Sequence, residues 1–168
     1  MSGLEIVFIF IALVTLFSAF KVVTAPKLIH AALWLIVTLF GVAMTYVLLN
    51  ATFLAVVQVV VYIGAIAILM IFAIMLTRKV MEDSGPQVNS NWGWAAILGV
   101  VLFAGLTVLL LNSGAADMTL PALAADFDPI AELGQQLVSP NAFVLPFEVA
   151  SVLLLAALIG AIVVAWER

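Results

Sequence analysis

Long apolar runs alternate with short polar stretches along the chain, and this pattern predicts five membrane-spanning helices. At a rise of 1.5 Å per residue, the longest run, 53–76, is long enough to cross a hydrocarbon layer of roughly 30 Å, and all five runs fall within the usual length of membrane-spanning helices, about 17–25 residues. The predicted fold class is therefore all-α, with one membrane domain over residues 1–168. The predicted spans are 4–23, 28–49, 53–76, 95–111 and 144–166, and an acidic loop covers 112–141.

Composition supports a membrane protein and excludes several kinds of site. The chain is 67% hydrophobic and 8% charged, too few charges to cover a soluble domain of this length. It has no cysteine and one histidine, which excludes thiolate metal sites, iron–sulfur sites and disulfides. No phosphate-binding loop, dinucleotide fingerprint or catalytic triad is present. We therefore expect no catalytic, cofactor-binding or metal-binding residues on this chain, and no nucleic-acid partner.

The basic residues predict how the helices are oriented. By the alternating topology, all of them fall on one side of the membrane, and the acidic loop falls on the other. The positive-inside rule then places the N-terminus outside and the C-terminus in the cytoplasm. The basic residues are Lys21, Lys27, Arg78, Lys79 and Arg168.

The third span, FLAVVQVVVYIGAIAILMIFAIML, carries residues that a plain lipid-facing helix would not. Gln58 and Tyr62 are four residues apart and would share one face of an α-helix, together with Ala55 and Ala65. Gly64 follows Tyr62 closely and weakens a helix by about 1 kcal/mol relative to Ala. An amide or phenol in hydrocarbon is costly without a partner. Two interpretations are open: these side chains bond to neighbouring helices and fix their packing, or they line a hydrated path.

Two further spans carry residues of interest. In the second, a polar or small stripe at spacings of three and four residues indicates helix–helix contact rather than lipid. The stripe consists of His30, Trp34, Thr38, Gly41 and Thr45. His30, at the end of that span, is an interfacial histidine or a proton carrier. Glu148 follows Pro146 in the first turn of the fifth span, where the helix N-terminus would stabilise a carboxylate.

Three segments resemble one family. The core of the third span, VQVVVYIGAIAIL, resembles the third transmembrane helix of subunit J of bacterial NADH:quinone oxidoreductase. That subunit is the counterpart of mitochondrial NADH dehydrogenase subunit six in respiratory complex I. The segment APKLIHAALWLI resembles the second helix of the family, and PFEVASVLLLAALIGAIVVA resembles the fifth. The resemblance covers nearly the whole chain, in the same order.

The resemblance implies a non-catalytic subunit of a proton-pumping translocase in the bacterial cytoplasmic membrane. It implies a place between the quinone-site subunit and the antiporter-like subunits, with FMN, iron–sulfur clusters and quinone held by other chains. In that family the third helix can contain a π-bulge, whose conversion to a regular helix opens or closes a water-filled proton path. This implies Gln58, Tyr62, Gly64 and Ala65 as proton-path and gating candidates, with Glu148 and His30 as secondary ones.

One residue departs from the family, and two other functions stay open. Some members carry glutamate where this chain has Gln58, and glutamine orders water but cannot store a proton. The first alternative is a subunit of a related multi-subunit cation/proton antiporter or membrane-bound hydrogenase. The second is a purely structural subunit whose helices hold others together.

Overall fold

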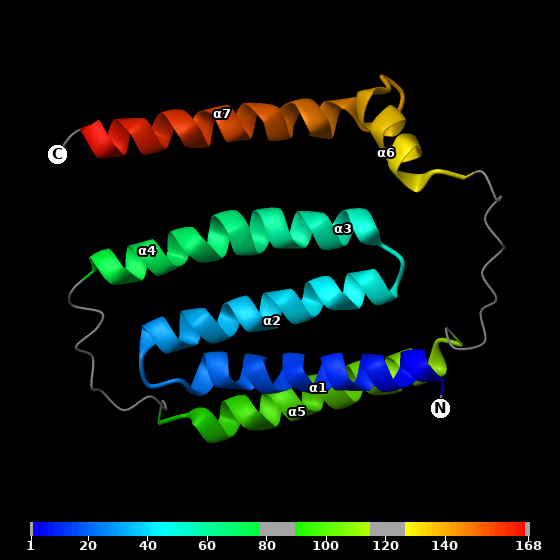
Figure 1. The fold of residues 1–168 in the computed structure, drawn as a ribbon, viewed down its shortest axis with the longest axis vertical. Helices are drawn as coiled ribbons and strands as arrows, with labels where there is room; N and C mark the ends of the chain where they lie inside the picture. Colours follow the sequence, from blue (N-terminus) through cyan, green and yellow to red (C-terminus); the bar gives the residue numbers. More distant parts are fainter. Residues whose placement is uncertain (1, 78–89, 115–126, 167–168) are drawn as a thin grey trace. The chain divides into compact units, whose positions relative to one another are not determined.

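The computed structural model describes residues 2–77, 90–114 and 127–166, and every regular element within these ranges is helical (Figure 1). Five helices are long and apolar enough to cross a membrane, which confirms the all-α prediction. They are α1 (Gly3–Thr24), α2 (Leu28–Leu48), the continuous helix Thr52–Leu76, α5 (Trp92–Asn112) and α7 (Val144–Trp166). Arg78, Lys79, Arg168 and positions 115–126 of the acidic loop lie outside the described residues.

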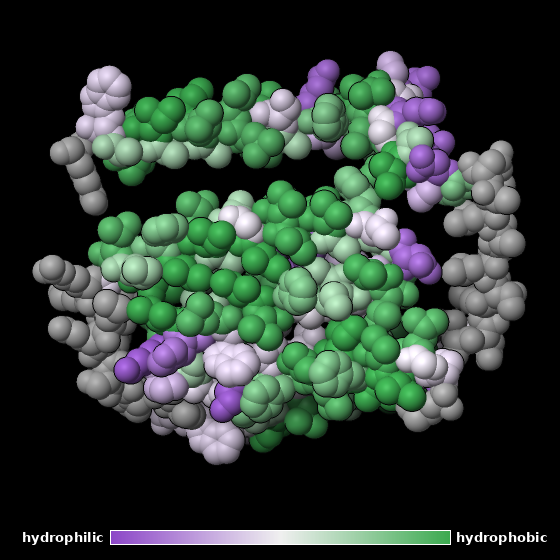
Figure 2. All heavy atoms as spheres, viewed as in Figure 1, coloured by the Kyte–Doolittle hydropathy of each residue, from purple (hydrophilic) through white to green (hydrophobic). Residues whose placement is uncertain are grey.

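Hydrophobic side chains cover the lengths of these helices, and hydrophilic ones gather toward their ends (Figure 2). The helix bounds lie close to the predicted ones. The largest difference is in α5, which begins at Trp92 rather than at residue 95. In lipid, backbone hydrogen bonds must be satisfied within the chain, and a helix does this. Each long apolar run therefore forms a helix over its whole length.

Local interactions fix the start of α1 and the end of α2. At the start of α1, the backbone N–H of Ser2 donates to Oε2 of Glu5 at 2.9 Å, and the Glu5 N–H donates to the Ser2 hydroxyl oxygen at 3.4 Å. This reciprocal cap satisfies backbone donors that have no partner inside the helix. At the end of α2, Asn50 adopts φ +58°, and the Ala51 N–H donates to the Tyr46 carbonyl at 2.9 Å. That tight reversal directs the chain straight into the next helix.

The chain divides into two compact units, residues 1–116 and 117–168. In the first unit, α2 lies between α1 and the helix Thr52–Leu76 and contacts both (Figure 1). The buried positions there are mostly small, so the backbones approach closely. They are Ile11, Ser18, Ala32, Gly41, Ala43, Ala55, Gln58 and Ala67.

The second unit contains a short helix, α6 (Pro129–Val138), followed by α7. The Asp128 carboxylate accepts hydrogen bonds from the N–H groups of Ile130 and Ala131, at 2.9 and 3.2 Å, and Pro129 occupies the first helical position. Both are strong signals for the start of a helix.

Candidate functional site

The third span is not one regular α-helix. It begins as α3 (Thr52–Val57), continues as a π-helix, η1 (Gln58–Ala67), and ends as α4 (Ile68–Leu76). In a π-helix each N–H bonds to the carbonyl five residues earlier, which adds one residue to every turn. Gln58, Tyr62, Gly64 and Ala65 all lie inside η1. The π-helical geometry that the family resemblance implied is therefore present, and at the residues it implied.

The π-helix changes which residues face the neighbouring helix. Gln58 and Ala67 are 6% and 2% exposed, and Ile63 between them is half-buried. The step from Gln58 to Ile63 is five residues, whereas an α-helix repeats a face every three or four. Of the four residues predicted to share a face, Ala55 and Gln58 are the two that are buried within this chain. Tyr62 is 47% exposed and Ala65 is exposed as well, because the wider turn displaces them.

Gln58 is a buried amide without a partner. Within the described part of the chain, its side chain makes no hydrogen bond. No described side-chain nitrogen or oxygen is both fully enclosed and unpaired, so the Gln58 amide keeps an opening to the surface. A buried amide is costly unless something bonds to it. The site thus offers a donor and an acceptor, in the first half of the third span, to water or to a group from another chain.

Gly64 is not required for space in the π-helical form. A Cβ atom added there would lie 3.4 Å from the carbonyl oxygen of Val59, five residues earlier, which is the near edge of ordinary contact. What glycine supplies at this position is a weaker helix, by about 1 kcal/mol relative to Ala. Gly64 therefore marks a locally weakened turn inside a rare helical form.

A hollow of about 450 Å³ lies between α2 and the first half of the third span. Its walls are aliphatic and aromatic apart from one hydroxyl, that of Thr52 near the end of the hairpin. Water needs several polar partners to remain in a cavity, so this hollow is not a hydrated path. The lining residues are Phe40, Ala43, Met44, Val47, Thr52, Ala55, Val56, Val59 and Val60.

The stripe predicted on the second span packs against α1. The Trp34 ring meets Phe17 edge-on with centroids 5.8 Å apart, and the Thr38 hydroxyl donates to Ser18 Oγ at 2.9 Å. A Cβ on Gly41 would overlap the Thr15 hydroxyl oxygen. These contacts confirm helix–helix packing for Trp34, Thr38 and Gly41 of the stripe.

The two secondary candidates lie outside this packing. His30 is exposed in the first turn of α2, and no described residue pairs with it. Glu148 is exposed and is the fifth residue of α7, whose first turn contains no acidic residue. The prediction that Glu148 lies in the first turn is therefore wrong, and the stabilising effect of the helix N-terminus has largely faded at its position.

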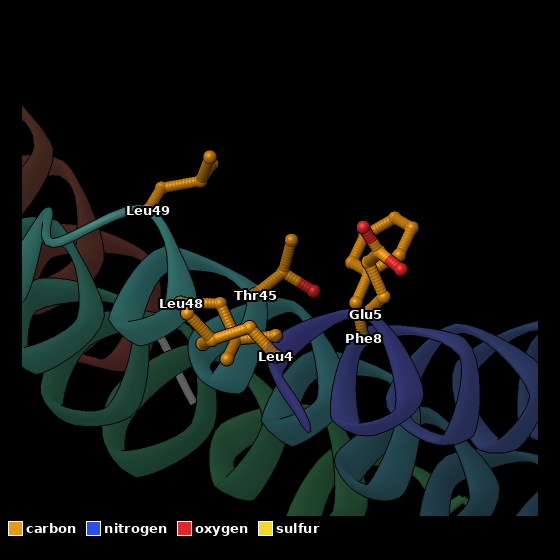
Figure 3. A pocket seen from close by; sticks show the side chains of 6 residues that line it. All are labelled: Leu4, Glu5, Phe8, Thr45, Leu48 and Leu49. Carbon is orange, nitrogen blue, oxygen red and sulfur yellow. The ribbon is translucent and has the colours of Figure 1, made fainter. Parts of the chain in front are cut away.

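The sequence analysis missed a small hollow of about 330 Å³ near the start of α1 (Figure 3). Glu5 and Thr45 are its only polar lining residues, and each has a local role. The Glu5 carboxylate caps α1, and the Thr45 hydroxyl donates to the Gly41 carbonyl at 3.0 Å. The other lining residues are Leu4, Phe8, Leu48 and Leu49. Among described residues, no three His, Asp or Glu side chains come together as metal ligands would.

Comparison with known proteins gives a consistent match. The family described as NADH-ubiquinone/plastoquinone oxidoreductase chain 6 matches residues 18–164. The F(420)H(2) dehydrogenase subunit J of Methanosarcina mazei is 44% identical over 161 residues, which cover 95% of this chain and 89% of that one. The NAD(P)H-quinone oxidoreductase chain 6 of a Nostoc species is 37% identical, with 98% and 80% covered. The chloroplastic NAD(P)H-quinone oxidoreductase subunit 6 of Staurastrum punctulatum is 39% identical, with 86% and 80% covered.

Proposed function

Because the chain belongs to the family of NADH-ubiquinone/plastoquinone oxidoreductase chain 6, the subunit J family of complex I, we propose that it helps couple quinone reduction to proton translocation. The family and the five apolar helices make it a multi-pass membrane subunit of an oxidoreductase complex of this type. Its own part is not catalytic. It acts as a gate on a water path at the third span.

The observation that carries this proposal is the π-helix η1 around the unpaired amide of Gln58. Conversion of η1 to an α-helix would remove the extra residue per turn and rotate the following side chains by roughly 100° for each turn converted, one residue's share of a turn. Tyr62 would then move onto the face that carries Gln58, and Ile63 would leave it. A phenol beside an amide gives water a chain of partners, whereas isoleucine beside an amide interrupts it.

Gln58 sets a limit on what this chain does in proton transfer. An amide donates and accepts hydrogen bonds but holds no titratable proton. Gln58 therefore orders water, and a proton-storing carboxylate on the path belongs to another subunit. His30 and Glu148 are exposed and away from this face, so we assign them no obligatory transfer step.

We infer the location and the neighbouring subunits of the chain from the same family membership. We place the chain in the bacterial cytoplasmic membrane as one membrane domain, beside a quinone-site subunit and antiporter-like subunits. FMN, iron–sulfur clusters and quinone bind to other chains of the complex. The N-terminus and the acidic loop face outward, and the C-terminus faces the cytoplasm, because the basic residues flank the opposite helix ends.

The test replaces Gln58 by Leu in the assembled complex and measures protons moved per electron in sealed vesicles. We expect a lower ratio, because leucine removes the only amide on the buried face of η1. Tyr62→Phe should also lower it, whereas Tyr46→Phe, the matched change in α2, should leave it unchanged. An unchanged ratio in fully assembled Gln58→Leu complex would mean that this subunit serves packing alone.

The relative from Methanosarcina mazei favours a second candidate, in which the electron donor is not NADH. That protein is named as a subunit of F(420)H(2) dehydrogenase, and it shares 44% of aligned residues with this chain. The same membrane subunit would then serve a complex with a different electron-input module. Purification through a tag on this chain separates the cases by the companions recovered: NADH-binding, F(420)H(2)-oxidising or hydrogenase subunits. Recovery of no quinone-site or antiporter-like subunit would contradict the assignment to complex I.

A further inference from the structure

The short helix α6 (Pro129–Val138) has one apolar side and one polar side. At 100° per residue, its aliphatic residues and Gly134 occupy one continuous arc, and the polar residues occupy the opposite arc. The Gln136 amide donates to the Glu132 carboxylate at 2.8 Å, which ties the polar side together. The apolar arc holds Ile130, Ala131, Leu133, Leu137 and Val138, and the polar arc holds Glu132, Gln135 and Gln136.

The apolar side has no sufficient cover within its own unit. Ile130 is 47% exposed and Leu133 is 45% exposed, although α6 contacts α7. Val138, near the end of the helix, is also exposed. Burying such side chains is worth about 1.5–3 kcal/mol each, so water is an unfavourable environment for this side.

The connection to α7 fixes where α6 can lie. The Ala142 N–H donates to the Ser139 carbonyl at 3.1 Å, and the Phe143 N–H donates to the Gln136 carbonyl at 3.0 Å. This closed turn leads directly into the apolar helix α7, whose axis α6 leaves at a steep angle (Figure 1). Where α7 crosses the bilayer, α6 must therefore sit at its rim and run along the surface for about 15 Å.

We infer that α6 is an interfacial helix that embeds its apolar side in the boundary between lipid headgroups and acyl chains. Its only charged residue is Glu132, so attraction to anionic headgroups does not hold it there. Burial of the aliphatic side chains holds α6 at the membrane surface. We therefore expect α6 to bind uncharged or zwitterionic lipid. This inference rests on α7 being a membrane span, and it is independent of the gate at η1.

The test uses the absence of cysteine from the chain, since one introduced thiol is then the only thiol on this subunit. Leu133→Cys and Gln135→Cys are two residues apart and on opposite sides of α6. Membranes containing the intact complex are opened and treated with a polymer-tagged maleimide, which shifts this subunit on a gel. We expect Leu133→Cys to react on the order of ten-fold more slowly than Gln135→Cys, because the reagent does not enter the acyl region. After denaturation in detergent both should react equally.

A second measurement identifies what covers the apolar side. Phosphatidylcholine with a photoreactive acyl chain is added to membranes with the unaltered complex, and the adducts are mapped by mass spectrometry. We expect adducts on α6 that raising the salt concentration does not remove. Equal, rapid labelling of both cysteines would place α6 in water and overturn the inference. Slow labelling without lipid adducts would show that another protein chain covers α6, and would overturn it as well. Ile130→Cys, on the same side, replaces Leu133→Cys if that variant does not accumulate.

Discussion

Of the described glycines, Gly41 has the least space around it, because a Cβ there would overlap the Thr15 hydroxyl oxygen. Gly41 is on α2 and Thr15 is on α1, so the two helices pack closely at this point. The sequence predicted this role from the small-residue stripe alone. It did not predict which polar residues of the third span are covered within the chain. The same spacing rule grouped Tyr62 with Gln58, and the two are separated by burial.

Replacement of Gly41 by Val should weaken the α1–α2 pair by about 1–3 kcal/mol, the usual cost of forcing extra atoms into a packed interface. The measurement is the thermal stability of the purified complex and the amount of this subunit in the membrane. Gly105→Val is the matched control, since a Cβ at Gly105 meets nothing within 4 Å. Equal effects of the two changes would contradict the role assigned to Gly41.

Ser18 and Thr38 form the hydrogen bond between α1 and α2, and its removal should cost little. The Ser18 hydroxyl also donates to the Thr15 carbonyl at 2.9 Å, and the Thr38 hydroxyl lies 3.0 Å from the Trp34 carbonyl. Each residue therefore keeps a partner when the other is lost. For Ser18→Ala, Thr38→Val and the double variant, we expect a coupling energy of about 0.6 kcal/mol in a thermal-unfolding cycle. A coupling near zero would show that packing alone joins the two helices.

At the scale of elements, helix existence and helix ends were predictable, and the internal form of the third span was not. Helix ends coincide with charges, prolines and Asn50, which the sequence displays directly. The third span is apolar on nearly all sides, so no hydrophobic period marks an extra residue per turn. Only the family resemblance indicated a π-helix. In the structure Ile63 is half-buried where Tyr62 is exposed.

Gly64→Ala should shift the third span from the π-helical toward the α-helical form. Alanine favours the regular α-helix over glycine by about 1 kcal/mol, whereas in the π form its Cβ would gain only ordinary contact with the Val59 carbonyl, at 3.4 Å. An effect of about 1 kcal/mol would change the ratio of the two forms about five-fold. The measurement is the fraction of each form among particles of the assembled complex in cryo-electron microscopy. Gly99→Ala in α5 serves as the control, and an unchanged ratio for Gly64→Ala would contradict the proposed weak point.

At the scale of the whole molecule, the apolar composition required a membrane, and the structure adds where side chains are left uncovered. Within the described residues, α5 and α7 contain no buried residue, and many of their large apolar side chains are exposed. Lipid satisfies such surfaces, and so do the helices of other subunits. The sequence could not show which of these surfaces face lipid and which face other subunits, because aliphatic side chains pack equally well against both.

The few charges of the chain predict its orientation in the membrane. Lys21 and Lys27 flank the link between α1 and α2, whereas the link at Asn50 and Ala51 carries no charge. Lys and Arg are retained on the cytoplasmic side during insertion, so the first link should be inside and the second outside. Ala25→Cys and Ala51→Cys place a single thiol in each link of this otherwise cysteine-free chain.

An impermeant maleimide added to intact cells should label Ala51→Cys and leave Ala25→Cys unmodified. Inverted vesicles should give the opposite result, because they expose the cytoplasmic face. The two substitutions match in size and type of site, so a difference reports the side of the membrane and not the reactivity of the thiol. The reverse labelling pattern would show that the whole subunit has the opposite orientation. The acidic loop and α6 would then lie on the cytoplasmic surface.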